Sequence, residues 1–291
     1  MFFSWGGFVR RRRVETHLVS LTLLFIFLGA CATSDSIEVE KRDRDAEVKV
    51  GRALAAAVLG RTPLLSEGEW AARSEYLRSL GGVLARRYGR PDVSHQFAWV
   101  DSDEVNAFAA PGGYIFLTRG LFQRVSSEDE LVVILLHEIS HVTERHVYKK
   151  IAPPRSTGVG FVLARLLAGG KGDLGVAVSR SVTQGLQILF ETGLGQEYER
   201  EADQAGVAMA SALGYDPHSL VRFLTESQDQ ASVKLRLPAT HPPLDRRKEW
   251  VVSWIRDQKL DEVSAMASRA LSVGSLKARR ERFIRMMGRK G

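Results

Sequence analysis

The 291-residue sequence contains a single cysteine, Cys31, so no disulfide bond can form within the chain. It also lacks internal repeats and low-complexity tracts, and its composition is that of an ordinary globular protein. Its long apolar run, within residues 18–30, is too short for the roughly 20 residues that a membrane-spanning helix needs. These absences favour one folded body without a disulfide framework.

The central part of the chain lacks a basic stripe with interleaved aromatic residues. Residues 1–30 have a net charge of +3 and residues 246–291 of +8, so the chain between them carries −4 of the total of +7. A nucleic-acid-binding protein usually carries positive charge on its folded body. We therefore expect no nucleic-acid partner. The basic C-terminal segment fits either attraction to anionic lipid or a solvated helix.

The first residues have the pattern of an export signal. Four arginines at 10–13 precede the apolar run and the small residues that end it. Leu28 to Cys31 resembles a bacterial lipobox, in which Cys31 is lipidated; the alternative is a buried or leftover thiol. By analogy with Gram-negative lipoproteins, Ala32 after the cysteine suggests an outer-membrane anchor facing the periplasm. We predict a signal peptide at 1–30 and a tether at 31–45.

The rest of the chain is predicted to be mostly helical with a small sheet. Residues 127–150 contain neither glycine nor proline, and Ser127 with Glu130 forms a capping box, so we predict a buried helix there. The other predicted helices are 46–58, 67–88, 196–213 and about 244 onward, and the predicted strands are 94–100 and 113–118.

The motif His137-Glu138-Ile139-Ser140-His141 predicts a metal site. On a helix, residues four apart lie on one side, so both imidazoles can bind one ion. Glu138 lies beside the metal, where it can act as the general base. The alternative is a pair of core histidines with satisfied hydrogen bonds. His146 lies half a turn away, and we expect it to be a surface or packing residue.

A third ligand is expected from the helix at 196–213. Glu199 and Asp203 fall on its apolar face, and buried carboxylates need a cation or strong donors. We predict Glu199 as a metal ligand and Asp203 as the acceptor for a ligand imidazole N–H. A salt bridge to an arginine is the alternative.

These residues resemble those of the M48 metallopeptidases, over roughly residues 46–250. Further similar segments are Asn106 to Leu121, Gly214 to Pro217 and His241 to Arg247. The resemblance implies an α+β, mostly α, zincin-like fold, in which the H-E-x-x-H helix packs against an E-x-x-A-D helix. Gly195-Gln196 departs from the family's usual Ser-Arg pair. Residues 251–291 then form a basic helical tail.

The resemblance also implies further site residues. His241 corresponds to a family histidine near the zinc, where it either stabilises the oxyanion or caps the metal; by itself it would be only a loop histidine. Arg247 is the expected partner of that site. The substrate is expected to pair with the strand containing Gly113, Tyr114, Ile115 and Phe116.

The predicted function is that of an endopeptidase with one zinc ion per chain. Its expected substrates are misfolded or mis-assembled envelope proteins, and its segment 155–195 could be a movable lid. One alternative is a non-catalytic lipoprotein chaperone or assembly scaffold. Another is a zinc hydrolase of cell-wall peptides. Partner proteins and oligomeric state are not specified by these patterns.

Overall fold

A computed structural model describes residues 40–151, 174–228, 241–271 and 273–288. By its internal contacts the chain divides into two units, Met1–Asp45 and Ala46–Gly291. Of the first unit only residues 40–45 are described, and they are helical. The predicted signal peptide and Cys31 lie outside the described residues, so both stay predictions. None of the described helices is long and apolar enough to cross a membrane.

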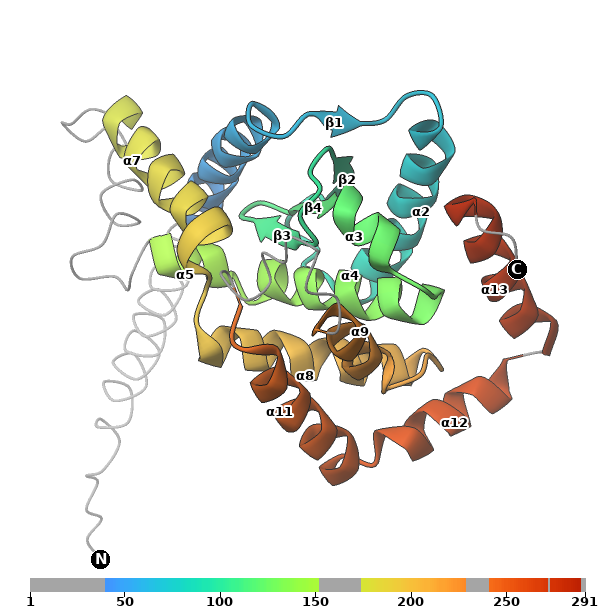
Figure 1. Ribbon diagram of the computed structural model, residues 1–291. Helices are drawn as coiled ribbons and strands as arrows, with labels where there is room; N and C mark the ends of the chain where they lie inside the picture. The colour runs from blue at the N-terminus through green and yellow to red at the C-terminus, as the bar shows by residue number, and fades with distance from the viewer. Residues whose placement is uncertain (1–39, 152–173, 229–240, 272, 289–291) are drawn as a thin grey trace, which may run out of the picture. The chain divides into compact units, whose positions relative to one another are not determined.

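The second unit is mostly helical with one small sheet, as predicted (Figure 1). Besides a helix at 46–59, its helices are α2 (Trp70–Tyr88), α3 (Arg119–Arg124), α4 (Glu128–Thr143), α5 (His146–Ile151), α7 (Leu174–Gln187), the π-helix η1 (Ile188–Thr192), α8 (Gln196–Ala212), α9 (Ser219–Gln228), α11 (Leu244–Asp257), α12 (Leu260–Ala270) and α13 (Val273–Met287). Its strands are β1 (Leu64–Leu65), β2 (Gln96–Val100), β3 (Ala107–Ala110) and β4 (Tyr114–Thr118). The two predicted strands correspond to β2 and β4.

The four strands form one sheet in the order β1-β2-β4-β3. The central pair, β2 and β4, is parallel, whereas β1 pairs with β2 and β3 with β4 in antiparallel register. Each edge of β4 is therefore already paired. Among the described residues, β3 is an edge strand.

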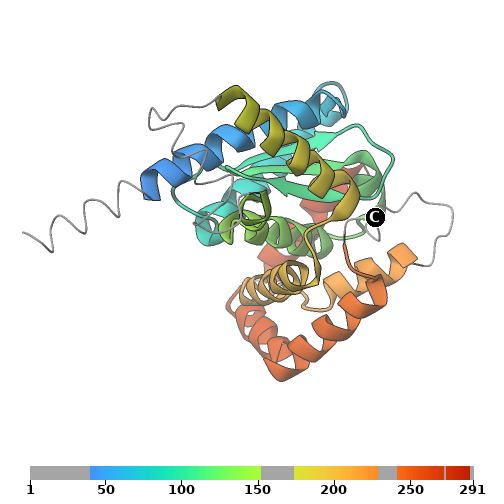
Figure 2. The ribbon, with the colours of Figure 1, turned by 90° about the vertical axis from the view of Figure 1, so that its left-hand side faces the viewer.

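Alternate side chains of the strands enter two different cores, as the two-residue period of a strand requires. One core, with α2, α4 and α8, takes in Phe97, Trp99, Ala107, Ala109, Ile115 and Leu117. The other, with residues 46–58, Val147 and Leu186, takes in Val100, Phe108, Ala110 and Phe116. Figure 2 shows the helix at 46–59 and α7 over this second face of the sheet.

The helix α4 is buried on nearly all sides, as its apolar sequence predicts. Ser127 caps it by accepting a hydrogen bond from the backbone N–H of Glu130. The Glu130 carboxylate accepts in return from the backbone N–H of Ser126 at 2.7 Å, one residue earlier than in an ideal capping box. Three acidic residues in the first turn favour this helix terminus.

The helix predicted over 127–150 is interrupted, which the sequence analysis did not anticipate. The α4 segment ends at Thr143, and Arg145 adopts a left-handed conformation with φ of 59°. A new helix, α5, starts at His146. An ion pair of 2.8 Å between Arg145 Nε and Glu47 Oε2 stabilises this break, since Glu47 is fully buried.

The α4 and α8 helices approach each other closely because small residues of α8 face α4. A Cβ atom on Gly206 would lie 3.1 Å from the backbone nitrogen of His137. Ala202 and Ala210, one turn to either side, are also fully buried. The predicted packing of the H-E-x-x-H helix against the E-x-x-A-D helix is confirmed.

The C-terminal helices pack onto the rest of the unit. Both α11 and α12 contact α8, and α13 contacts α2 and α4. Phe283 and Met287 of α13 are buried in the core that contains α4. The helix α11 runs across residue 250, where the boundary between domain and tail was predicted.

Candidate metal centre

The two histidines of the motif lie one turn apart on α4 and face the same way. Their Nε2 atoms are 3.0 Å apart, and the rings are nearly perpendicular at 81°. His137, Glu138 and His141 are each at most 4% exposed. Two imidazole nitrogens that lie this close together can both bind one transition-metal ion.

Glu199 of α8 completes the group that was predicted from sequence. Its Oε2 atom lies 3.6 Å from His137 Nε2, and its Oε1 atom lies 3.6 Å from His141 Nε2. The carboxylate is 1% exposed, and Oε2 has no hydrogen-bond partner in the described part of the chain. Burial raises the pKa of Glu199 to about 8, so the charged carboxylate is costly without a cation beside it.

His241 reaches the same carboxylate from the loop before α11. Its Nε2 atom lies 3.4 Å from Glu199 Oε2, and the ligand atoms of His137, Glu199 and His241 all lie within 4.8 Å of one another. Only the family resemblance pointed to this histidine, because nothing in its own loop sequence indicates a ligand.

The separations between these atoms are of the size expected around one metal ion. Ligand atoms bound at the usual zinc distances lie about 3.3–3.5 Å from one another. The four separations given above range from 3.0 to 3.6 Å. The unpartnered oxygen of Glu199 points to the same conclusion, so the donor set matches a divalent cation.

Asp203 lies behind His137, on the side away from the ligand atoms. Its Oδ1 atom is 2.9 Å from His137 Nδ1 and accepts a hydrogen bond from Arg247 Nη2 at 2.6 Å, and its Oδ2 atom accepts one from Arg247 Nε at 2.9 Å. Burial by itself would raise the pKa of Asp203, but the charge and hydrogen bonds of Arg247 outweigh it and hold that pKa well below its ordinary value. Asp203 is therefore an ionised carboxylate in contact with the His137 ring.

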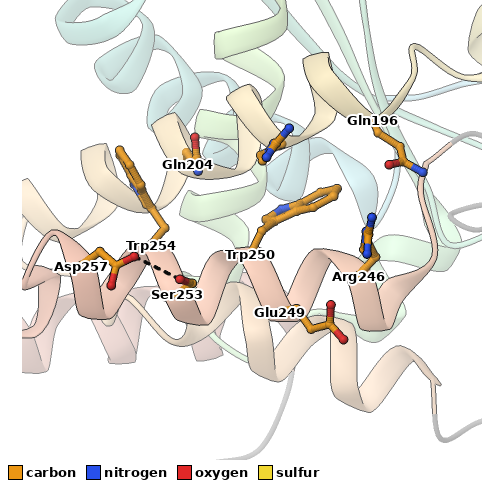
Figure 3. Close-up of a pocket in the computed structure, with 9 residues that line it drawn as sticks. Gln196, Gln204, Arg246, Glu249, Trp250, Ser253, Trp254 and Asp257 are labelled. Atoms are coloured by element: carbon orange, nitrogen blue, oxygen red, sulfur yellow. Dashed lines mark hydrogen bonds between the residues drawn. The ribbon is translucent and has the colours of Figure 1, made fainter.

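Trp250 of α11 also donates to Asp203, through Nε1 at 2.9 Å. Together with Trp254 it lines a groove of about 400 Å³ between α8 and α11 (Figure 3). None of the candidate ligand residues lines this groove. Trp250 was not among the predicted site residues, because a tryptophan on an amphipathic helix usually indicates a core residue.

Glu138 adjoins two small cavities of about 20 Å³ each. One is lined by apolar side chains that include Leu121, Ile134 and Phe223. The other is bounded by β3, by Ile188 and Leu189 of η1, and by Glu199. Burial raises the pKa of Glu138 to about 7, which suits a group that must both accept and release a proton near neutral pH.

The expected substrate strand is wrong. Tyr114 to Phe116 belong to β4, whose backbone pairs with β2 on one edge and with β3 on the other. Gly113 accepts a hydrogen bond from the backbone of Gln96. A substrate cannot add to these residues. The strand that borders both the sheet edge and the metal centre is β3.

His146 is not a surface residue. Because α4 ends early, the chain turns back and places the His146 ring against His141. The ring is fully buried, and the two Nδ1 atoms are 2.8 Å apart. The sequence contained no signal for this return, since Arg145 is neither glycine nor asparagine.

Comparison with known proteins shows which sequences this chain resembles. A family profile described as peptidase family M48 matches residues 71–255, more than half of the chain. The beta-barrel assembly-enhancing protease of Escherichia coli K12 is 31% identical over 206 residues, which are 67% of this chain and 41% of that protein. The mitochondrial metalloendopeptidase OMA1 of Schizosaccharomyces pombe is 27% identical over 177 residues, 59% of this chain and 50% of that protein. The chain thus spans about two fifths to one half of the length of these relatives.

Proposed function

This chain belongs to peptidase family M48, and from that membership we propose that it is a zinc-dependent endopeptidase acting on cell-envelope proteins. The observation that carries the proposal is the convergence of three histidine Nε2 atoms on the buried Glu199 carboxylate, at 3.4 to 3.6 Å from one or the other of its oxygens. His137, His141 and Glu199 would hold one zinc ion. Asp203, fixed by Arg247, would orient His137 and keep its hydrogen on Nδ1.

A bound zinc ion lowers the pKa of a water ligand toward 7 and polarises the carbonyl of the scissile bond. Glu138 takes the proton of the attacking water on its carboxylate and delivers it to the leaving amine. Its burial and its position on both cavities support this role, since the proton is moved out of contact with bulk water.

His241 is proposed to cap the metal in a resting enzyme. Its Nε2 atom stands as close to Glu199 as the nitrogens of the other two histidines do. In this position it would compete with water for the metal, so we expect it to withdraw before substrate binds. Once withdrawn, it could donate to the oxyanion from the same loop.

The substrate is proposed to add, as an extended strand, to the edge of β3 that pairs with no other described strand. Residues 107–109 of β3 border the cavity that contains Glu138 and Glu199. Main-chain pairing tolerates many sequences, which suits a protease that acts on misfolded or mis-assembled polypeptides. Residues 188–194 bound the same cavity and would have to move to admit the chain.

The proposed location is the periplasmic side of the outer membrane, with Cys31 lipidated. Support comes from the signal-like first 30 residues and from the Escherichia coli relative, which is named for β-barrel assembly. The natural substrate, within this class, is not specified by the site. A non-catalytic lipoprotein scaffold is the alternative class, and a hydrolase of cell-wall peptides would share the chemistry.

Metal analysis combined with a cleavage assay tests the proposal. The purified protein should contain about one zinc per chain and cleave an unfolded protein such as casein, and a chelator should stop the cleavage. Glu138→Gln should keep the zinc and abolish cleavage. Full activity in Glu138→Gln would refute the base assignment. Zinc without cleavage of any protein would favour the scaffold, and cleavage of peptidoglycan peptides alone would favour the cell-wall hydrolase.

A further inference from the structure

The return of the chain after α4 places a second imidazole directly behind His141. The left-handed residue Arg145 ends α4, and His146 follows as the first residue of α5. The Nδ1 atoms of His141 and His146 are 2.8 Å apart, and the two rings meet at 71°. This contact lies on the side of His141 opposite its Nε2 atom.

The hydrogen positions of this pair follow from the ligand set. The Nε2 atom of His141 faces His137 Nε2 at 3.0 Å, so a metal bound there would leave the ring hydrogen of His141 on Nδ1. That N–H can donate only to an unprotonated Nδ1 of His146. His146 must then carry its own hydrogen on Nε2, which lies 3.3 Å from Glu201 Oε2.

The His146 ring is also fixed in place. It is fully buried and stacks on Tyr198 of α8, with ring centroids 4.4 Å apart and an angle of 30° between the planes. Arg145, next to it, is held by Glu47 and lies over the ring of Tyr148. A fixed, desolvated acceptor orients its donor better than water does, because water would be free to exchange.

We infer that His146 is a positioning residue of the metal centre: it fixes the tautomer and the ring orientation of His141, as Asp203 does for His137. Glu201 and Tyr198 support it from α8. The two ligand histidines would then be held by different chemistry, one by a carboxylate that is paired with Arg247 and the other by a neutral imidazole. This inference rests on the proposed function only in requiring that the site binds a metal.

The test compares zinc affinity among variants, by competition with a chromogenic chelator. His146→Leu, which keeps bulk but removes the acceptor, should bind zinc about 10- to 100-fold more weakly than the wild type. His146→Asn should recover part of the loss, because its side-chain oxygen can accept. The visible spectrum of the cobalt-substituted protein should change in His146→Leu. The matched control is His218→Ala, a partly exposed histidine of a surface ion pair, which should leave affinity unchanged.

A folded His146→Leu protein that binds zinc within threefold of the wild type would overturn the inference. So would a wild-type protein that binds no zinc. If the wild-type protein binds zinc but has no peptidase activity, the proposed function is refuted, whereas the inference about His146 is not affected. A second measurement needs no variant: long-range proton–nitrogen NMR of the zinc-loaded protein should show hydrogen on Nδ1 of His141 and on Nε2 of His146. The opposite tautomer of His146 would also refute the role.

Discussion

Arg282, in the last helix, binds the carboxylate of Glu128, the first residue of the helix that carries the metal-binding motif. Its Nη2 atom donates to both oxygens of Glu128, at 2.7 and 3.0 Å, across 154 residues of sequence. The hydroxyls of Tyr76 and Tyr215 donate to the same carboxylate, at 2.6 and 3.0 Å. Because Glu128 is 3% exposed, its carboxylate needs these donors in place of the hydrogen bonds it would make with water.

Arg282→Ala should therefore destabilise the protein, by about 1–3 kcal/mol, the range for a hydrogen bond to a buried charged group. The melting temperature should fall by several degrees, measured by circular dichroism or calorimetry. Arg280→Ala, an exposed neighbour on the same helix, is the control and should have little effect. Equal stability of the two variants would contradict a structural role for Arg282.

Alkaline pH should destabilise the fold through the same cluster. Burial, and then the charge of Glu128, raise the pKa of Tyr76 and of Tyr215 well above 10. In the unfolded chain these tyrosines ionise near pH 10, so their contribution to stability is complete below pH 10 and is lost as the pH rises beyond it.

Absorbance at 295 nm as a function of pH measures this effect. Two of the six tyrosines should ionise only as the protein unfolds. In Glu128→Gln the two should ionise at lower pH, since one cause of the raised pKa is removed. Six tyrosines that all ionise near pH 10 in the folded wild type would contradict the prediction.

Gly206→Val should weaken metal binding and stability together. A Cβ at this position meets the backbone of His137 at 3.1 Å and that of Val133 at 3.2 Å, and backbone cannot move aside as a side chain can. Overpacking of this kind costs about 1–3 kcal/mol. Gly82→Ala is the control: its Cβ meets only the mobile end of Arg86, so helix propensity should make it slightly stabilising. Zinc content and melting temperature are the two measurements.

Glu199→Ala should lower zinc affinity by at least about tenfold, because it removes a ligand and not only an orienting group. Glu197→Ala, on the exposed side of the same helix turn, should leave the affinity unchanged. Equilibrium dialysis against a zinc buffer distinguishes the two. Equal affinities would mean that α8 contributes no ligand.

The local patterns of the sequence predicted those parts of the site that one helix face determines. The spacing of His137 and His141, the cap at Ser127 and the buried face of α8 all follow from helix geometry, and the structure contains them. The packing of α4 against α8 was expected from the family resemblance, and small residues on the face that carries Glu199 permit it. These features depend on period and side-chain size alone.

The parts that sequence missed depend on contacts between distant segments. Arg145 takes a left-handed conformation although it has a Cβ atom, and the buried Glu47, about 100 residues earlier, pairs with it. The place of β4 inside the sheet depends on which strands pair, and strand order cannot be read from a short apolar run. The substrate strand was misjudged for this reason, and His146 is a packing residue and not a surface one.

The helix that carries the motif is held at both ends by ion pairs with residues remote in sequence. Glu128 at its beginning depends on Arg282, and Arg145 just beyond its end depends on Glu47. Since synthesis proceeds from the N-terminus, a nascent chain presents Glu47 long before Arg282. The centre therefore acquires its full rigidity only after Arg282 has been added, and until then its histidines lie on a helix that is secured at one end.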